Sequence, residues 1–288
     1  MSEATDTVAP AYETDAPVRY ERRESVAVIS LDRPRYGNAQ NGQMLYALDA
    51  AFARAAADAE VRAIVLRGEG KHFSSGHDIG TPGCDFGVSR PDRRTLWYDH
   101  AGTPGAETNY VREQESYLGL CRRWRDIPKP MVAAVQGACI AGGLMLAWVA
   151  DMIVAADDAF FQDPVLRMGV PGVEYFAHVF EMHPRIAREF LYLGERMPAA
   201  RAHELGMVNR VVPRDQLDET ALAVAAKAAE SPRFALALAK QAFNQLEDLQ
   251  GKRSGMDAVF SLHHLAHAHN QLTGDWLGGV RAGDVKKN

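Results

Sequence analysis

Short apolar runs alternate along the first half of the chain with longer segments in which apolar residues recur every three or four positions. The apolar runs, which are typical of buried strands, are residues 26–31, 63–66, 131–135, 152–155 and 159–162. Between the first two runs, residues 40–57 place Met44, Leu48 and Phe52 on one face, the spacing of an amphipathic helix. Strands that alternate with helices at this spacing predict an α/β fold with crossover connections.

The pattern changes after Gly172, where helical periodicity dominates. We expect helices over residues 184–193, 199–205, 217–230, 232–249 and 255–270, with a single strand at 208–212. These apolar helix faces must be buried, and we therefore expect this part to pack on the α/β core or on another subunit. We therefore divide the chain into a mobile tail (1–18), a core (19–212) and a helical C-terminal segment (213–288).

Two turns made of small residues stand at the ends of predicted strands. After the strand 131–135 the pair Gly142-Gly143 opens an apolar helix, and the strand 63–66 runs through a turn rich in serine and glycine to His77. Small side chains let a ligand approach the main chain, and the first N–H groups of a helix lack internal partners. Two such turns could aim two N–H donors at one carbonyl oxygen, which stabilises an enolate or a tetrahedral oxyanion. Close packing of a helix on a strand is the alternative explanation of the glycine pair.

Composition and charge narrow the classes of partner. The 288 residues are 47% hydrophobic and 24% charged, with a net charge of −5, which favours neither nucleic acid nor an anionic membrane. No stretch reaches the roughly 18 uninterrupted apolar residues of a membrane helix, and residues 1–18 lack the apolar core of a targeting signal. Cys84, Cys121 and Cys139 show no CxxC spacing. We therefore predict no disulfide framework and a cytoplasmic protein.

One segment has no recognisable pattern. Residues 80–108 are rich in glycine, proline, aspartate and arginine and exceed the length of an ordinary loop. We expect an irregular insertion or an active-site lid here, followed by a helix at 113–124. Residues 80–115 should therefore shape the substrate pocket.

Several motifs follow one another in order between residues 25 and 215. They are Leu31-Asp32-Arg33-Pro34, residues 73–79, Lys129-Pro130 through Gly137, Ala141-Gly142-Gly143, Phe161-Gln162-Asp163-Pro164, Gly169-Val170-Pro171-Gly172 and residues 199–209. In order and spacing they resemble the crotonase superfamily, the enoyl-CoA hydratase/isomerase fold. The resemblance implies a spiral of β-β-α units with a helical C-terminal segment, homotrimers or dimers of trimers, and an acyl-CoA thioester as substrate without any other cofactor. It also implies that the main-chain N–H groups of His77 and Gly142 hold the thioester oxygen.

The acid/base positions depart from that family pattern. Enoyl-CoA hydratases use two glutamates to activate water and to deliver a proton, and this sequence has Met145 and Val165 at the corresponding positions. Neither side chain can move a proton, so we predict proton-shift isomerisation or decarboxylation through an enolate, which one carboxyl group can perform. The alternatives are an enoyl-CoA hydratase or acyl-CoA hydrolase with a relocated acid/base, or a protein that binds CoA esters without turnover. The sequence leaves the acyl group open.

Four ionisable side chains near these motifs are candidates for the chemistry. Glu174 is the preferred acid/base, and its alternative role is that of a carboxylate at the N-terminus of the following helix. His77 and Tyr175 are candidate assistants, although the N–H of His77 matters more than its imidazole and Tyr175 must turn inward. Asp163 is a further candidate, but acidic residues in such turns commonly cap a helix.

Contacts with CoA are expected near the first small-residue turn. Lys71 matches a position that lines the CoA pocket in relatives, and its alternative is an exposed turn lysine. We predict that Ser75 and Asp78 lie at the same binding surface, although Asp78 is also suited to cap the turn. The basic segment 122–125 (Arg-Arg-Trp-Arg) could contact the phosphates of CoA or form a solvated face.

A histidine cluster near the C-terminus has spacings that suit zinc. Its members are His263, His264, His267 and His269. They include i,i+3 and i,i+4 pairs, which can hold a zinc ion, but no carboxylate or cysteine accompanies them at a matching spacing. We therefore predict no metal site here and expect a polar face at a subunit contact.

Overall fold

A six-stranded sheet forms the centre of the structure, a computed structural model that describes residues 16–79, 103 and 105–274. Its strands are β1 (Val18–Arg23), β2 (Val26–Leu31), β3 (Ala63–Gly68), β4 (Met131–Val135), β6 (Met152–Ala156) and β9 (Arg210–Val212). They lie in the order β1-β2-β3-β4-β6-β9, and every neighbouring pair is parallel except β1 with β2. Strands β2 and β4 are buried along their whole length, which explains why each reads as an unbroken apolar run.

A second sheet of three short strands continues the path of the chain. Its strands are β5 (Ala138–Ile140), β7 (Phe160–Gln162) and β8 (Met197–Pro198). A strand of the large sheet, a strand of the small sheet and a helix form one unit, as in β4, β5 and α4 (Gly142–Trp148). Isolated parallel bridges from Ser74 to Cys139 and from Gln40 to His77 extend the same arrangement to the two preceding turns of the chain. The β-β-α repeat is therefore the one predicted.

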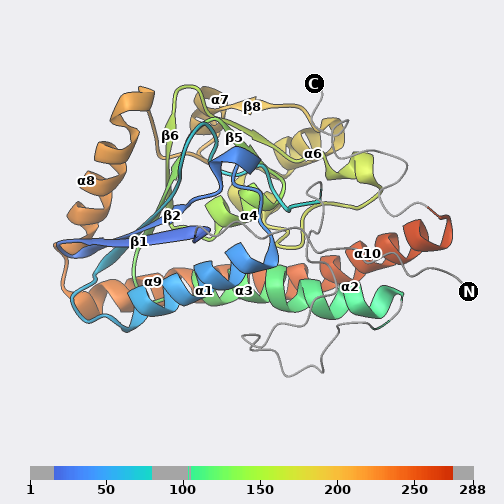
Figure 1. Cartoon of the computed structure of the whole chain (residues 1–288), viewed down its shortest axis with the longest axis horizontal. Helices are drawn as coiled ribbons and strands as arrows, with labels where there is room; N and C mark the ends of the chain where they lie inside the picture. Colours follow the sequence, from blue (N-terminus) through green and yellow to red (C-terminus); the bar gives the residue numbers. More distant parts are fainter. Residues whose placement is uncertain (1–15, 80–102, 104, 275–288) are drawn as a thin grey trace, which may run out of the picture.

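Helices cover both faces of the large sheet, and the alternation along β2 shows how. Ile29 and Leu31 belong to the core beneath α1 (Gly42–Ala57), α3 (Leu120–Arg125) and α4, whereas Val26 and Val28 belong to the core beneath α8 (Leu217–Ala229). Figure 1 shows α8 on one side of the sheet and α1 and α3 on the other. The buried residues of α8 that meet the sheet are mostly alanines, so this helix can approach the strands closely.

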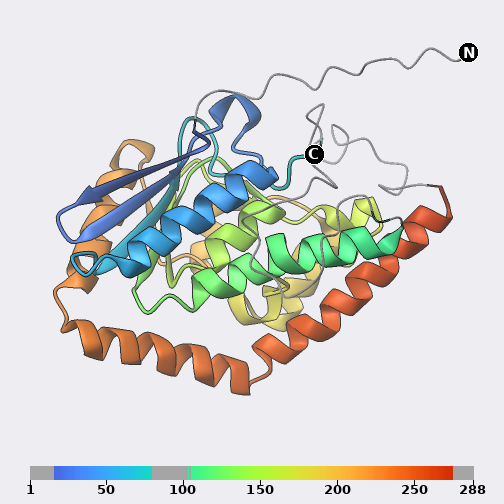
Figure 2. The ribbon, with the colours of Figure 1, turned by 60° about the horizontal axis from the view of Figure 1, so that its bottom comes forward.

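Further helices lie on opposite sides of the molecule. They are α2 (Ala106–Glu113), a π-helical turn (Gln114–Gly119), α5 (His178–Glu181), α6 (Pro184–Leu193), α7 (Ala199–Glu204), α9 (Arg233–Leu249) and α10 (Lys252–Leu272). Figure 1 shows α6 and α7 at the top and α2, α9 and α10 along the bottom. Helix α10 packs against α2 and α9, and Figure 2 shows α9 and α10 along the outer edge of the body. In the part of the chain that the structure describes, no helix has the length and apolar character to cross a membrane.

The structure differs from the predicted elements in a few places. Strand β1 was not predicted, because its mostly exposed and charged residues lie at the edge of the sheet, and its first residue, Val18, falls inside the predicted tail. The helix predicted at 113–124 begins earlier, at Ala106. Residues 80–102 of the predicted insertion, together with Cys84, lie outside the described residues.

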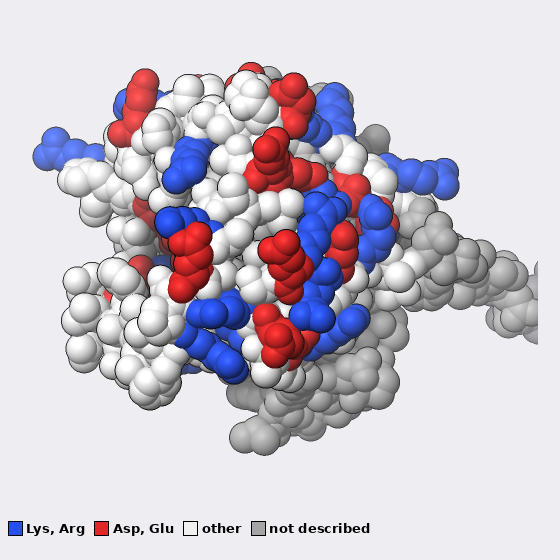
Figure 3. Space-filling model, turned by 90° about the vertical axis from the view of Figure 1, so that its left-hand side faces the viewer, with Lys and Arg blue, Asp and Glu red and all other residues white. Residues whose placement is uncertain are grey.

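The basic segment 122–125 does not form a free basic patch. Arg122 pairs with Asp257 at 2.8 Å, Arg123 with Asp49 at 3.3 Å, and Arg125 with Glu247 at 2.8 Å, while Trp124 is buried. These pairs join α3 to α1, α9 and α10, so the expectation that the segment binds CoA phosphates is wrong. Figure 3 shows acidic and basic side chains interspersed on another face of the molecule.

Candidate active site

The two small-residue turns lie against each other. The bridge between Ser74 and Cys139 aligns the turn after β3 with β5. At the start of α4, a Cβ atom on Gly142 would lie 3.2 Å from the main-chain nitrogen of His77 and 2.7 Å from its imidazole Cε1. Only glycine leaves this space open. The structure therefore places next to each other the two residues whose N–H groups the sequence suggested as one pair of donors.

Neighbouring hydrogen bonds orient these N–H groups. The Gln40 N–H donates to the Gly76 carbonyl at 2.8 Å, and the Asp78 N–H donates to the Gln40 carbonyl at 2.9 Å. Because successive N–H groups of an extended chain point in opposite directions, the His77 N–H is turned away from Gln40. Gly142 is the first residue of α4, so its N–H has no acceptor within that helix. Ala141 precedes it with a φ of +49°, a strained conformation of the kind that clusters at functional sites.

Glu174 and His77 form a hydrogen-bonded pair beside these amides. The Nε2 of His77 lies 3.1 Å from Oε2 of Glu174, and since an ionised carboxylate can only accept, the imidazole donates. The His77 ring stacks on Tyr117 with 3.7 Å between ring centroids. Burial raises the pKa of Glu174, but the charge of His77 and its hydrogen bond, together with His263, lower that pKa overall. The carboxyl group is therefore held in its ionised form, ready to accept a proton.

A cavity of about 70 Å³ opens in front of this pair. Its walls include His77, Glu174, Tyr117, Ala141, Val165, Met168, Val170, Arg112, Glu113, His263 and His267. Val165 therefore presents an apolar wall to the cavity, while Met145 is buried in the hydrophobic core. Glu174 is the carboxylate at the position that the sequence favoured, and it faces this cavity.

Two predicted participants lie elsewhere. Tyr175 is 1% exposed, and its side chain lines a separate small cavity with Arg125 and Lys252, where burial raises the pKa of the phenol. The loop does not turn Tyr175 toward Glu174, so the assisting role predicted for Tyr175 is wrong. Asp163 is fully buried, lies 2.8 Å from Nε2 of His178 and accepts a hydrogen bond from the Val165 N–H at 3.4 Å. Its carboxylate is therefore held by His178 and by the first N–H of the following 3-10 turn, and Pro164 is the N-cap of that turn.

The residues expected near CoA fall into two groups. Asp78 is buried and forms an ion pair with Arg33 at 3.0 Å, so its carboxylate stabilises the turn, and its predicted contact with CoA stays a prediction. Lys71 is exposed, and the hydroxyl of Ser75 lies 3.4 Å from the Tyr36 carbonyl, a hydrogen bond at the protein surface. The roles of Lys71 and Ser75 in CoA binding stay predictions.

Sequence reasoning did not place Glu113 or His263 at this cavity. The Nε2 of His263 lies 3.5 Å from Oε2 of Glu113 and 3.8 Å from Oε1 of Glu174. Burial lowers the pKa of His263, but the two carboxylates outweigh it and raise this pKa to about 9. For His264, which Glu113 contacts at 3.3 Å, burial dominates and lowers the pKa to about 4.

The histidine cluster is therefore not the polar face that we expected at a subunit contact. His263 and His264 are buried within the chain, and of the four histidines His269 alone is exposed. The carboxylate that the local spacing lacked comes from Glu113, 150 positions before His263, on α2. The i,i+4 pair of histidines was the signal in the sequence, whereas nothing near Glu113 indicated its partners.

Comparison with known proteins identifies the family. The sequence model of the family "Enoyl-CoA hydratase/isomerase" matches residues 21–85 and 101–274. The chain belongs to this family. The crotonase fold expected from the motifs is thus confirmed, and the enzyme is of the enoyl-CoA hydratase/isomerase type, whose substrates are acyl-CoA esters.

Relatives within the family cover nearly the whole chain. The crystal structure of a probable enoyl-CoA hydratase from Mycobacterium smegmatis matches with a TM-score of 0.83 at 42% identity, over 93% of this chain and 100% of that one. The crystal structure of a probable enoyl-CoA hydratase from Mycobacterium thermoresistibile matches with a TM-score of 0.80 at 43% identity, over 90% of this chain and 100% of that one. In sequence, "Putative enoyl-CoA hydratase EchA13" of Mycobacterium tuberculosis is 40% identical over 268 residues, which are 90% of this chain and 84% of that protein.

Proposed function

We propose that this enoyl-CoA hydratase/isomerase-like enzyme moves a proton on an acyl-CoA thioester, by isomerisation or by decarboxylation, through an enolate. The observation that carries the proposal is the position of Glu174, a buried carboxylate in the cavity next to His77 and Gly142. The apolar residues Met145 and Val165 stand where the resemblance places the two glutamates of hydratases.

The geometry supports a simple sequence of steps for isomerisation. The N–H groups of His77 and Gly142 donate to the thioester oxygen and stabilise the negative charge that develops on it. The Glu174 carboxylate removes a proton from the carbon chain, the electron pair moves into the enolate, and the same group returns the proton two carbons away. The hydrogen bond from His77 Nε2 keeps Glu174 in position between the two transfers.

Decarboxylation uses the same groups with a different first step. The bond between the α-carbon and the substrate carboxylate breaks, carbon dioxide leaves, and the electron pair enters the enolate. The α-carbon then takes a proton delivered through Glu174 from solvent. Both reactions need a single carboxyl group, which is why they suit this cavity.

Hydration with a relocated second carboxylate is the second candidate function. Glu113 lines the same cavity as Glu174, and the two carboxylates approach one imidazole nitrogen, Nε2 of His263, at 3.5 and 3.8 Å. Two carboxylates in one cavity are what hydration or thioester hydrolysis requires. If the enzyme hydrates its substrate, this arrangement favours Glu113 and Glu174 as the two acid/base groups, in place of the usual positions 145 and 165.

The proposed CoA surface and assembly follow from what lies outside the cavity. Lys71 and Ser75 flank the turn that carries His77 and are proposed to contact the CoA moiety. The exposed apolar side chains of α9 and α10 support a homotrimer or a dimer of trimers, in which another subunit would cover them. They include Phe234 (75% exposed), Phe243, Leu246, Leu249, Leu262 and Leu265. Size-exclusion chromatography with light scattering tests this assembly, and a monomer would contradict it.

Mass spectrometry of acyl-CoA esters incubated with the protein in D2O tests the proposed reaction. With a panel of 2-enoyl, 3-enoyl and malonyl esters, we expect deuterium at the α- or γ-carbon without addition of water. Glu174→Gln should reduce this exchange by about 10²- to 10⁴-fold. Glu181→Gln is the matched control, because Glu181 is a half-buried carboxylate paired with Lys252 at 3.3 Å and lies outside the cavity walls.

Each other outcome points to a specific alternative. Addition of water to a 2-enoyl ester that is lost in Glu113→Gln would establish hydration by the relocated pair. Release of free CoA would establish a hydrolase. Tight binding of the esters with no turnover of any would support the non-catalytic alternative and contradict the proposal.

A further inference from the structure

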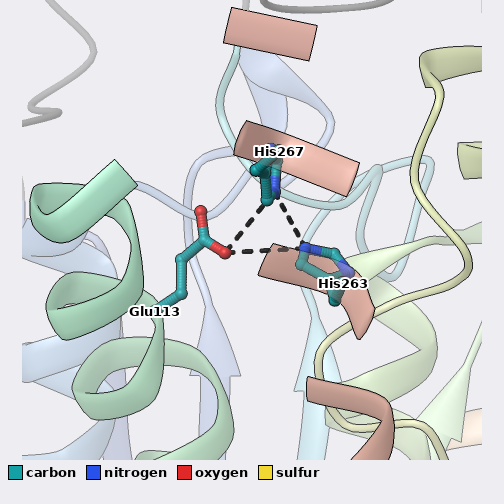
Figure 4. Close-up of side chains that lie close together, drawn as sticks. All are labelled: Glu113, His263 and His267. Carbon is teal, nitrogen blue, oxygen red and sulfur yellow. Dashed lines mark hydrogen bonds and ion pairs between the residues drawn. The ribbon is translucent and has the colours of Figure 1, made fainter. Parts of the chain in front are cut away.

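Three side chains on one wall of the cavity point toward one another. None of them has a role in the proposed proton transfer by Glu174. Glu113 ends α2, and His263 and His267 lie one turn apart on α10. Figure 4 shows the three side chains pointing toward one another from the two helices. The distances between their facing atoms are 2.9 Å from His263 Nε2 to His267 Nε2, and 3.5 and 3.6 Å from Glu113 Oε2 to these two nitrogens. We call this group the His–Glu triangle.

The hydrogen bonds around the triangle leave acceptor atoms facing inward. His263 Nδ1 lies 2.8 Å from the Gly172 carbonyl. Because a carbonyl can only accept, Nδ1 carries the hydrogen, so Nε2 is the nitrogen that faces the triangle, and its lone pair becomes available to a metal ion when its proton leaves. Glu113 Oε1 accepts from Arg112 Nη2 at 2.9 Å, whereas the buried Oε2 accepts no hydrogen bond from the part of the chain that the structure describes.

A single proton cannot satisfy this arrangement. A proton lies along one edge of a triangle, between one donor and one acceptor, and leaves the third atom without a partner. A metal ion at the centre contacts all three atoms at once. The buried Oε2 of Glu113 makes no hydrogen bond with the described residues and faces imidazole nitrogens of His263 and His267, with His264 Nε2 also 3.3 Å away. A cation explains this arrangement better than a hydrogen bond does.

The distances fit a transition metal. Zinc bonds of about 2.0–2.2 Å to imidazole nitrogen and carboxylate oxygen place tetrahedral ligand atoms about 3.3–3.5 Å apart. The three edges of 2.9, 3.5 and 3.6 Å are close to this requirement. Two imidazoles and one carboxylate suit zinc, cobalt or nickel, whereas magnesium and calcium prefer sites made of oxygen atoms.

The surroundings match those of known metal sites. A metal-bound histidine commonly donates its other ring N–H to a carbonyl, as His263 does to Gly172, and a ligating carboxylate is commonly held by a second hydrogen bond, as Glu113 is by Arg112. All three residues line the cavity that also holds Glu174. A fourth coordination position would therefore open toward the substrate, as in zinc sites with three protein ligands.

We propose that Glu113, His263 and His267 bind one divalent transition-metal ion of the zinc type, with an open coordination position that faces the cavity. The site lies next to Glu174, whose Oε1 is 3.8 Å from His263 Nε2, and it goes beyond the proton transfer proposed above. Metal binding is measured without substrate, so a failure of the metal site and a failure of the proposed reaction are distinguishable.

The test uses the full-length chain without a histidine tag, stripped with a chelator and dialysed. Titration with Zn²⁺ in a calorimeter, and with Co²⁺ followed by its visible d–d absorption, should give one ion per chain with a four- or five-coordinate cobalt spectrum. His267→Gln and Glu113→Gln should each weaken metal binding by at least about 100-fold. Loss of a residue that only hydrogen-bonds to a metal ligand already lowers metal affinity by about 10- to 100-fold. His269→Gln is the matched control on the same helix, because His269 is exposed, and it should bind like the wild type.

Two results would overturn the proposal. One is a wild-type chain that takes up no stoichiometric Zn²⁺ or Co²⁺, and the other is a His267→Gln variant that binds as tightly as the wild type. X-ray absorption spectroscopy of the cobalt-loaded wild type does not depend on the folding of any variant. It should show two imidazole ligands with the remaining ligands oxygen, and a shell of oxygen atoms alone would contradict the site.

Discussion

The candidate active site has two halves, one formed by main-chain groups and the other by side chains. The half around His77 and Gly142 consists of main-chain N–H groups at the ends of neighbouring strands, and small residues keep the space in front of them open. The half around Glu174 consists of side chains from the loop before α5, from α2 and from α10, joined by the contacts of His77 and His263. In the proposed mechanism, the backbone half binds the thioester oxygen and the side-chain half transfers the proton at the carbon chain beside it.

This division means that the two halves should respond differently to substitution. A backbone donor is lost only when something occupies its space or moves the chain, whereas a side-chain group is lost by a change of one functional group. Three substitutions test the division, in order of decreasing expected effect.

Gly142→Ala should produce the largest loss of these three. The added methyl group would lie 3.2 Å from the His77 nitrogen and under 3.0 Å from the imidazole, close to the place of the carbonyl oxygen. Loss of one such donor costs about 10²- to 10³-fold in kcat, and we expect a loss of this size in steady-state kinetics on the substrate found by mass spectrometry.

Gly255→Ala is the control for that change. A Cβ at Gly255 in α10 would meet no atom within 4 Å, and alanine stabilises a helix interior by about 0.5–1 kcal/mol relative to glycine. Its activity should equal that of the wild type, with an equal or higher melting temperature. Activity in Gly142→Ala within a few-fold of the wild type would contradict the role of the backbone half.

The fold and the two small-residue turns that lie together at the site could be predicted from the sequence because their signals are local. Unbroken apolar runs predict β2 and β4, and the glycine pair 142–143 predicts where α4 begins. The side-chain half could not, because Glu113 and His263 come together only through the packing of α2 on α10. The same limit explains Tyr175, whose direction depends on the turn of a loop and not on its distance from Glu174 along the chain.

His77→Gln should produce an intermediate loss and separates the two roles of this residue. The variant keeps the main-chain N–H but loses the imidazole hydrogen bond to Glu174 and the stacking on Tyr117. A hydrogen bond to a charged group contributes about 1.5–3 kcal/mol, so kcat should fall by about 10- to 100-fold. A loss as large as that of Glu174→Gln would show that the imidazole itself transfers the proton, and no loss would show that it does not position Glu174.

Tyr175→Phe should have no effect on activity. The phenol lies with Arg125 and Lys252 in a cavity separate from that of Glu174, so kcat and KM should both stay within about twofold of the wild type, the range expected for a residue outside the site. A tenfold or greater loss of kcat with an unchanged melting temperature would show that Tyr175 takes part in the reaction.

A crystal structure with a bound saturated acyl-CoA ester tests the central claim most directly, namely that the two halves act on one thioester. The account predicts a thioester oxygen about 2.7–3.1 Å from both the His77 and the Gly142 nitrogens, with the Glu174 carboxylate facing the carbon chain next to it. A thioester oxygen bound away from these two amides, or a carbon chain out of reach of Glu174, would contradict it.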